Sequence, residues 1–221
     1  MSKRTDGPCP IAPGQRSVAP PIAAALPRVG NRWRRTLALT ALIIALIPIV
    51  AAMAFPPLRR IAPGLYGLSC RSHVCAEDLA ALPAAENLYR EAVVFVGRKV
   101  IPLAEPRQVI FCRTDRCSQH FGLSGRRVGQ TTGPFGSVIG PRGWAAHTVR
   151  HELIHQIQNQ ALGMYRLRPG PDWFIEGMAY AWSDDPREDL GAPWQAYRRE
   201  FLIWSATTPR QEFWDRAAEL W

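Results

Sequence analysis

An uninterrupted apolar segment near the N-terminus places the strongest limit on how this chain can fold. Between Thr36 and Leu58 no residue is charged, and residues 36–55 read TLALTALIIALIPIVAAMAF. Twenty such residues in a helix span about 30 Å, which is the thickness of the hydrocarbon core of a bilayer. A buried helix of a soluble domain is usually shorter and keeps a polar stripe, which this segment lacks. We therefore predict one transmembrane helix within residues 36–58.

The charges that flank this segment predict its orientation. Residues 1–35 carry seven Lys or Arg residues and one acid, whereas only Arg59 and Arg60 follow the segment directly. The positive-inside rule then predicts a cytoplasmic tail, a signal anchor at residues 36–58 and a periplasmic or extracellular domain at residues 59–221 of a single-pass inner-membrane protein. The alternative is a signal peptide cleaved near Ala54, which would release a secreted domain.

The basic charge of the chain belongs mainly to the tail. The whole chain has 27 basic and 18 acidic residues, and residues 56–221 hold 20 and 17 of them. The exported part is therefore close to balanced, and we expect no nucleic-acid partner. The tail at residues 1–35 is rich in Pro and Ala without any period, so we expect it to be disordered. The lipid bilayer is the expected partner of residues 36–58.

The cysteines fit the same topology. Cys9 lies in the tail and would be free, whereas Cys70 and Cys75, and likewise Cys112 and Cys117, form two pairs of equal spacing beyond the apolar segment. Four cysteines in an exported domain predict two disulfides. Three pairings are open, of which local bridging within each pair is the simplest. A zinc ribbon is disfavoured because its paired cysteines are usually closer in sequence.

Apolar periodicity predicts an α+β domain. Residues 144–162 have helical spacing with Gly163 as a stop, and residues 173–182 form a second expected helix. Other helices are expected in residues 77–96, near residues 118–121 and in two stretches of residues 190–221, and short strands at residues 108–112 and 137–139. Residues 122–136 are rich in Gly and Arg and are expected to form a loop. Helices and strands in this segregated order indicate the α+β class.

One pentapeptide carries metal-binding chemistry. Residues 151–155 read His-Glu-Leu-Ile-His, and because residues four apart share a helix face, His151 and His155 can reach one ion. Neutral imidazole is a common zinc ligand. Glu152 lies beside that face, where a carboxylate can accept a proton from a water that the metal activates. The pentapeptide therefore predicts a Zn²⁺ site with Glu152 as the general base.

A third ligand is expected in the next helix. Glu176 lies 21 residues after His155, within the sequence WFIEGMA at residues 173–179. Its neighbours are apolar, and a lone carboxylate among them would be costly without a partner cation. Two His and one Glu would leave one coordination position open, which a catalytic zinc needs for water.

The pentapeptide at residues 151–155 and the W-x-x-E-G-x-A pattern at residues 173–179 together resemble the gluzincin clan, the thermolysin-like zinc metallopeptidases. The resemblance implies a small zincin-like domain with an active-site helix, a short edge strand and a helical C-terminal part, acting on a peptide or protein substrate. It also implies that His151, His155 and Glu176 are zinc ligands and that Glu152 is the general base.

Two further roles follow from this resemblance. Residues 137–139, which are Ser137, Val138 and Ile139, would form an edge strand that pairs with extended substrate. Members of the clan also supply a Tyr or His that stabilises the oxyanion, and no motif maps that residue here. The candidates are Tyr165, Tyr180 and His147.

The sequence leaves more than one function open. The first hypothesis is zinc-dependent hydrolysis of peptide bonds at the outer face of the membrane. The alternative is a catalytically inactive exported module that keeps the zinc fold for binding or as a scaffold, and a third is a non-peptidase zinc hydrolase. Glu152 favours hydrolysis, because a binding module has no need of a general base. No feature of the sequence identifies a partner protein.

Overall fold

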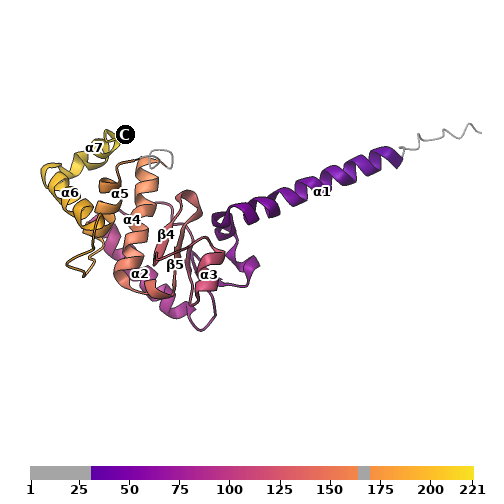
Figure 1. The fold of residues 1–221 in the computed structure, drawn as a ribbon, viewed down its shortest axis with the longest axis horizontal. Coiled ribbons are helices and arrows are strands. Elements are labelled where there is room, and N and C mark those ends of the chain that lie inside the picture. The colour runs from indigo at the N-terminus through magenta and orange to yellow at the C-terminus, as the bar shows by residue number, and fades with distance from the viewer. Residues whose placement is uncertain (1–30, 164–169) are drawn as a thin grey trace, which may run out of the picture. The chain divides into compact units, whose positions relative to one another are not determined.

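The computed structural model describes residues 31–163 and 170–221 (Figure 1). The chain divides between Ile44 and Ala45 into two compact units. Three predictions lie outside the described residues: the free thiol of Cys9, the candidate Tyr165, and the disorder of residues 1–35 as far as residue 30. Residues 31–35 are described and helical, so the disorder predicted for them is wrong.

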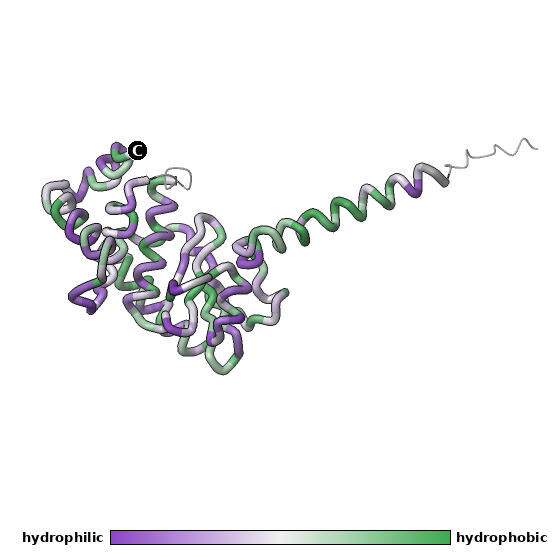
Figure 2. Tube along the Cα trace, in the orientation of Figure 1, coloured by the Kyte–Doolittle hydropathy of each residue, from purple (hydrophilic) through white to green (hydrophobic). Residues whose placement is uncertain are grey.

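The apolar segment forms helix α1 (Asn31–Ala54). Its part Trp33–Ala54 has a mean hydropathy of 2.7, and it is the one helix among the described residues that is long and apolar enough to cross a membrane. Figure 2 shows the hydrophobic colour along most of its length. The helix ends at Ala54 because the residue before a proline disfavours helical backbone, and Pro56 and Pro57 follow. It can act as a membrane anchor or as a signal.

The residues after α1 belong to the folded domain. Arg60 lies in a short 3₁₀ helix (Pro56–Ile61) and is fully buried. Its guanidinium donates hydrogen bonds to the carbonyl oxygens of Phe121 and Gly136, at 2.8 and 3.0 Å, and to Oγ1 of Thr132 at 3.1 Å. Burial penalises the charge and lowers the pKa of Arg60 to about 10, although Glu152 opposes this shift. Arg60 therefore ties the segment after α1 to the loops around the sheet.

A five-stranded mixed sheet forms one part of the domain. The strands are β1 (Ser69–Arg71), β2 (Val74–Ala76), β3 (Val109–Phe111), β4 (Gly129–Thr131) and β5 (Ser137–Ile139), in the order β1-β2-β3-β5-β4. The central strands β2, β3 and β5 are parallel, and the outer pairs are antiparallel. All residues of the central strands are buried, as parallel strands covered on both faces require.

The strand at residues 137–139 was predicted correctly, but its place in the sheet was not. β5 pairs with β3 on one side and with β4 on the other, so it is an inner strand. The edge strand on this side of the sheet is β4, which lies within residues 122–136, where the sequence predicted only loop. Its residues Gly-Gln-Thr lack the apolar alternation that marks a strand. β1 and β2 were also missed, because Ser-Cys-Arg and Val-Cys-Ala do not form the run of β-branched and aromatic residues that marks β3 as a strand.

Six helices complete the domain. They are α2 (Leu82–Lys99), α3 (Asp115–His120), α4 (Ala146–Leu162), α5 (Asp172–Trp182), α6 (Trp194–Thr207) and α7 (Phe213–Ala218). These confirm the predicted helices and the α+β class. α2 begins later than predicted, at Leu82, since Pro83 fits only the first turn of a helix. Gly163 ends α4 with a φ of 76°.

Helix α4 lies at the centre of the domain and positions the site. It contacts β4 and β5 on one side and the helices α2, α5 and α7 on others (Figure 1). Its buried residues Val149, Leu153, Ile154 and Ile157 belong to the main hydrophobic cluster, which also includes Phe174 of α5. An α-helix held on several sides by apolar packing is a rigid support for side chains that must keep fixed distances.

The two disulfides are local. Cys70 bonds to Cys75 and Cys112 bonds to Cys117, which is the simplest of the three pairings that the sequence left open. Cys75 lies in β2 and Cys112 directly follows β3, and both are fully buried. Disulfides form and persist in oxidising compartments, so they indicate an extracytoplasmic domain.

Candidate metal centre

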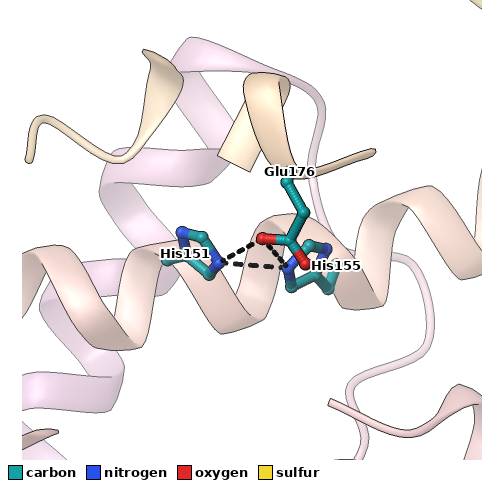
Figure 3. Close-up of side chains that lie close together, drawn as sticks. All are labelled: His151, His155 and Glu176. Carbon is teal, nitrogen blue, oxygen red and sulfur yellow. Dashed lines mark hydrogen bonds and ion pairs between the residues drawn. The ribbon is translucent and has the colours of Figure 1, made fainter. Parts of the chain in front are cut away.

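Helices α4 and α5 bring three ligand groups together. His151 and His155 lie one turn apart on α4, and Glu176 projects toward both from α5 (Figure 3). The two Nε2 atoms are 3.1 Å apart, and Oε2 of Glu176 lies 3.5 Å from Nε2 of His151 and 3.8 Å from Nε2 of His155. These three residues can hold a metal ion.

The distances fit one tetrahedral ion. Bonds of about 2.1 Å from zinc to nitrogen or oxygen separate tetrahedral ligand atoms by about 3.4 Å. The observed separations of 3.1, 3.5 and 3.8 Å lie on both sides of that value. Two imidazoles and one carboxylate form a ligand set that suits zinc and leaves the fourth position open.

A buried glutamine orients one of the imidazoles. Oε1 of Gln158 lies 2.8 Å from Nδ1 of His155, and Nε2 of Gln158 donates to the carbonyl of Ile175 at 2.9 Å. Because the amide nitrogen donates to Ile175, the amide oxygen accepts the Nδ1 proton of His155. The lone pair of Nε2 then faces the other ligands, as metal-binding histidines require. The sequence analysis missed Gln158, whose one signal is its position three residues after His155 on a buried face.

Electrostatics keep Glu176 ionised. Burial raises the pKa of its carboxyl, but electrostatic attraction to the neighbouring imidazoles of His155 and His151 and a hydrogen bond from His151 outweigh burial and lower the pKa to about 2. The side chain is 29% exposed, whereas the two histidines are 13% and 14% exposed. The carboxylate is therefore ready to coordinate a cation at the border of a cleft.

Glu152 lies beside the three ligands and is almost completely buried, with 4% of its surface exposed. Burial raises the pKa of its carboxyl, against the opposing effects of His155, Thr131 and Arg60. A carboxylate with a raised pKa is a better proton acceptor, which is what a general base needs. Gly129 of β4 makes room for it, because a Cβ there would lie 2.6 Å from Oε1 of Glu152.

A cleft of about 720 Å³ opens over this cluster. It is formed by α4, α5, β4 and residues 185–187, with Phe55 and Phe135 among its lining residues. Its volume lies within the roughly 300–1,000 Å³ of typical ligand sites.

One wall of the cleft is the outer edge of β4. The N–H of Thr132 donates to Gly136 and the carbonyl of Val128 accepts from Gly140, so the even-numbered residues pair with β5. Backbone groups alternate in direction along an antiparallel strand, so those of Gly129 and Thr131 point away from β5. Both residues line the cleft.

The structure changes the role predicted for residues 137–139. Ser137, Val138 and Ile139 are fully buried inside the sheet, so the prediction that they form a substrate-pairing edge is wrong. β4 has that position instead. The error has a physical cause, since apolar residues mark the strand that is most buried rather than the strand at the edge.

Two of the three oxyanion candidates lie at the cleft. The ring of Tyr180 is 4.5 Å from the ring of His151, and burial raises the pKa of the tyrosine hydroxyl. His147 also lines the cleft, and burial lowers the pKa of its imidazole. Sequence reasoning missed two further lining residues, Asp185 and Arg187, which form an ion pair at 2.5 Å.

Comparison of the chain with protein-family models, with curated proteins and with solved structures gives no significant match.

Proposed function

We propose that this chain is a zinc-dependent peptidase of gluzincin type. The observation that carries the proposal is the position of one proton acceptor, Glu152, beside a three-ligand cluster at the base of a cleft. The edge of β4 in the same cleft supports a polypeptide substrate, because an extended chain can add to a strand edge through backbone hydrogen bonds. The resemblance in residues 151–155 and 173–179 supports the same class.

The residues of the chain divide the chemistry between them. His151, His155 and Glu176 would hold the zinc ion, which would supply Lewis-acid activation of water and of the substrate carbonyl when bound. Glu152 takes the proton of the attacking water and then delivers it to the leaving amine. Gly129 and Thr131 of β4 align the substrate backbone across the cleft.

The oxyanion that forms during attack needs a donor besides the metal. Tyr180 lines the cleft beside His151, and its hydroxyl can donate a hydrogen bond. His147 lines the same cleft one turn before His151. We assign the role to one of these two residues.

The proposed location is the outer face of the inner membrane. Helix α1 anchors the chain with its basic N-terminal flank inside, and the disulfide-bonded domain lies in the periplasm or outside the cell. Cleavage near Ala54 would give the same domain in secreted form.

Metal content and peptide cleavage test the proposal together. The full chain is purified in detergent, its zinc is measured by mass spectrometry, and a random peptide library is incubated with it. We expect one zinc per chain, loss of zinc in Glu176→Gln, and zinc without cleavage in Glu152→Gln. Glu200→Gln is the matched control, because Glu200 is exposed on α6 and outside the cluster.

Each failure has its own meaning. A folded chain that binds no zinc refutes the metal site. A chain that binds zinc and cleaves no peptide refutes the peptidase and favours the alternative, an inactive zinc-binding or scaffold module.

A further inference from the structure

A series of hydrogen-bonded polar side chains in the interior connects the loop before β3 to the proposed general base. Gln156 and Glu152 lie one turn apart on α4, Ser137 begins β5 and Thr131 ends β4. Ser137 is fully buried, and Gln156 and Glu152 are 1% and 4% exposed. Polar groups at such depth are costly unless each has a partner, so their arrangement is a strong constraint on the fold.

The hydrogen bonds between these side chains all run in one direction, with each group donating to the next one toward Glu152. Oε1 of Gln156 accepts from the backbone N–H of Arg107 at 3.1 Å, so Nε2 of Gln156 is the atom that donates to Oγ of Ser137 at 2.9 Å. The hydroxyl of Ser137 is then free to donate to Oγ1 of Thr131, which lies 2.7 Å away.

The hydroxyl proton of Thr131 is left for Glu152. Two acceptor atoms of Glu152 lie within hydrogen-bond distance of Oγ1 of Thr131, namely Oε2 at 2.7 Å and the backbone carbonyl oxygen at 2.9 Å. When Glu152 is a carboxylate, the hydroxyl donates to Oε2. When Glu152 has taken a proton from water, its Oε2–H can donate to Thr131, whose own proton turns to the carbonyl oxygen. A hydrogen bond between the two side chains is therefore retained on both sides of the proton transfer.

The same face of β4 also restricts the position of the Glu152 carboxylate at a second residue, Gly129. Residues two apart in a strand point to one face, so Gly129 and Thr131 both face Glu152. A side chain at position 129 would lie 2.6 Å from Oε1 and displace the carboxylate. The backbone N–H and C=O groups of Gly129 and Thr131 thus face the cleft, whereas the side-chain positions of the same two residues face Glu152.

We propose that Thr131, oriented by Ser137 and Gln156, is a positioning residue that holds the Glu152 carboxylate at the metal centre. The proposal deepens the proposed function, because it rests on Glu152 as the general base. It gives Ser137 a role that differs from the substrate contact expected from the sequence. Thr131 acts through Glu152 and through the alignment of β4, and it is not a metal ligand.

Substitutions at position 131 separate the hydroxyl from the shape of the side chain. Thr131→Val keeps the volume and removes the hydroxyl, whereas Thr131→Ser keeps the hydroxyl. Thr132→Val is the matched control, because the hydroxyl of Thr132 accepts a hydrogen bond from Arg60, whereas the hydroxyl of Thr131 donates to Glu152. All variants are made in the full chain and checked for zinc content, which should stay at the wild-type level.

The first readout does not depend on activity. In the metal-free chain labelled with ¹³C-glutamate, the Glu152 carboxyl resonance is assigned by its absence in Glu152→Gln and recorded at one pH. We expect one resonance in the wild type, in Thr132→Val and in Thr131→Ser, and a shifted or divided resonance in Thr131→Val. An unchanged resonance in Thr131→Val, or the same change in Thr132→Val, would overturn the proposal.

The second readout is turnover of a peptide that the wild type cleaves. Hydrogen-bond partners that orient metal ligands typically contribute about tenfold to a hundredfold to activity. For a partner that orients the base we expect a loss of similar size in the kcat of Thr131→Val, with little change in KM. Thr131→Ser should restore most of it. A rise in KM with an unchanged kcat would contradict the proposal that Thr131 positions the base. If the wild type cleaves no peptide, the proposed function fails and the carboxyl resonance still decides whether Thr131 holds Glu152.

Discussion

Replacing Gln158 by leucine should weaken zinc binding while all three ligands remain. Gln158 is fully buried, and its amide links Nδ1 of His155 to the carbonyl of Ile175. Without metal, the variant can move the imidazole proton to Nε2 of His155, which lies 3.1 Å from Nε2 of His151. Metal binding forces the proton back to Nδ1, where the leucine offers no acceptor. The unpaired N–H of His155 therefore destabilises the zinc-bound state and not the metal-free state.

The size of the effect follows from that unpaired donor. A buried N–H without a partner costs about 1–3 kcal/mol. At about 1.4 kcal/mol for each factor of ten, zinc affinity should fall about 5- to 150-fold. Competition with a chromophoric chelator measures this difference. Gln158→Glu should bind zinc more tightly than Gln158→Leu, because a carboxylate still accepts the Nδ1 proton of His155 although it cannot donate to the carbonyl of Ile175.

A matched control lies two residues further along the same helix. Gln160 also makes two hydrogen bonds, both to the backbone of Glu105, and neither reaches a metal ligand. Gln160→Leu should therefore leave zinc affinity unchanged. The reasoning is refuted if folded Gln158→Leu binds zinc as tightly as Gln160→Leu.

Three other outcomes are expected. Gly129→Ala should keep its zinc and lose hydrolysis, because the added Cβ would meet Oε1 of Glu152 at 2.6 Å; zinc content and kcat measured on the same sample decide this. Under denaturing conditions, thiol labelling should find one free cysteine before reduction and all five after it, since two local disulfides take up four. Burial raises the pKa of the Asp185 carboxyl, but hydrogen bonds from Arg187 outweigh burial and lower it. This carboxylate stabilises the fold above its unfolded pKa of about 3.9, and the contribution is lost as the pH falls through the folded value. Asp185→Asn should therefore be less stable than the wild type at pH 7, and chemical denaturation at about pH 3 should show a smaller difference.

Several features of the fold could be predicted because their signals are local. The uncharged run at residues 36–58 predicted the existence of α1 but not its bounds, since the helix begins at Asn31 among basic residues and ends at Ala54. The helices α4 and α5 follow from apolar spacing. The end of α4 at Gly163 follows from the backbone preference of a single residue, whereas the start of α2 was placed too early, at residue 77 instead of Leu82.

The strands were harder to predict because their positions depend on partners. β1 and β2 were missed because Ser-Cys-Arg and Val-Cys-Ala carry no run of β-branched or aromatic residues, whereas β3, which reads Val-Ile-Phe, carries one. β4 has no apolar residue, and only its hydrogen bonds with β5 make it a strand. The prediction of β5 as an edge was wrong because strand order is a property of the whole sheet.

For the site, the sequence alone determined which residues share a surface on one helix. A spacing of four residues places His151 and His155 on the same face wherever the helix lies. Only the tertiary structure placed Oε2 of Glu176 within 3.5 and 3.8 Å of these two imidazoles. It alone brought Thr131 to Glu152 and Gln158 to the carbonyl of Ile175. The physical reason is that periodicity describes contacts along one element, whereas these distances depend on how α4, α5 and β4 pack against one another.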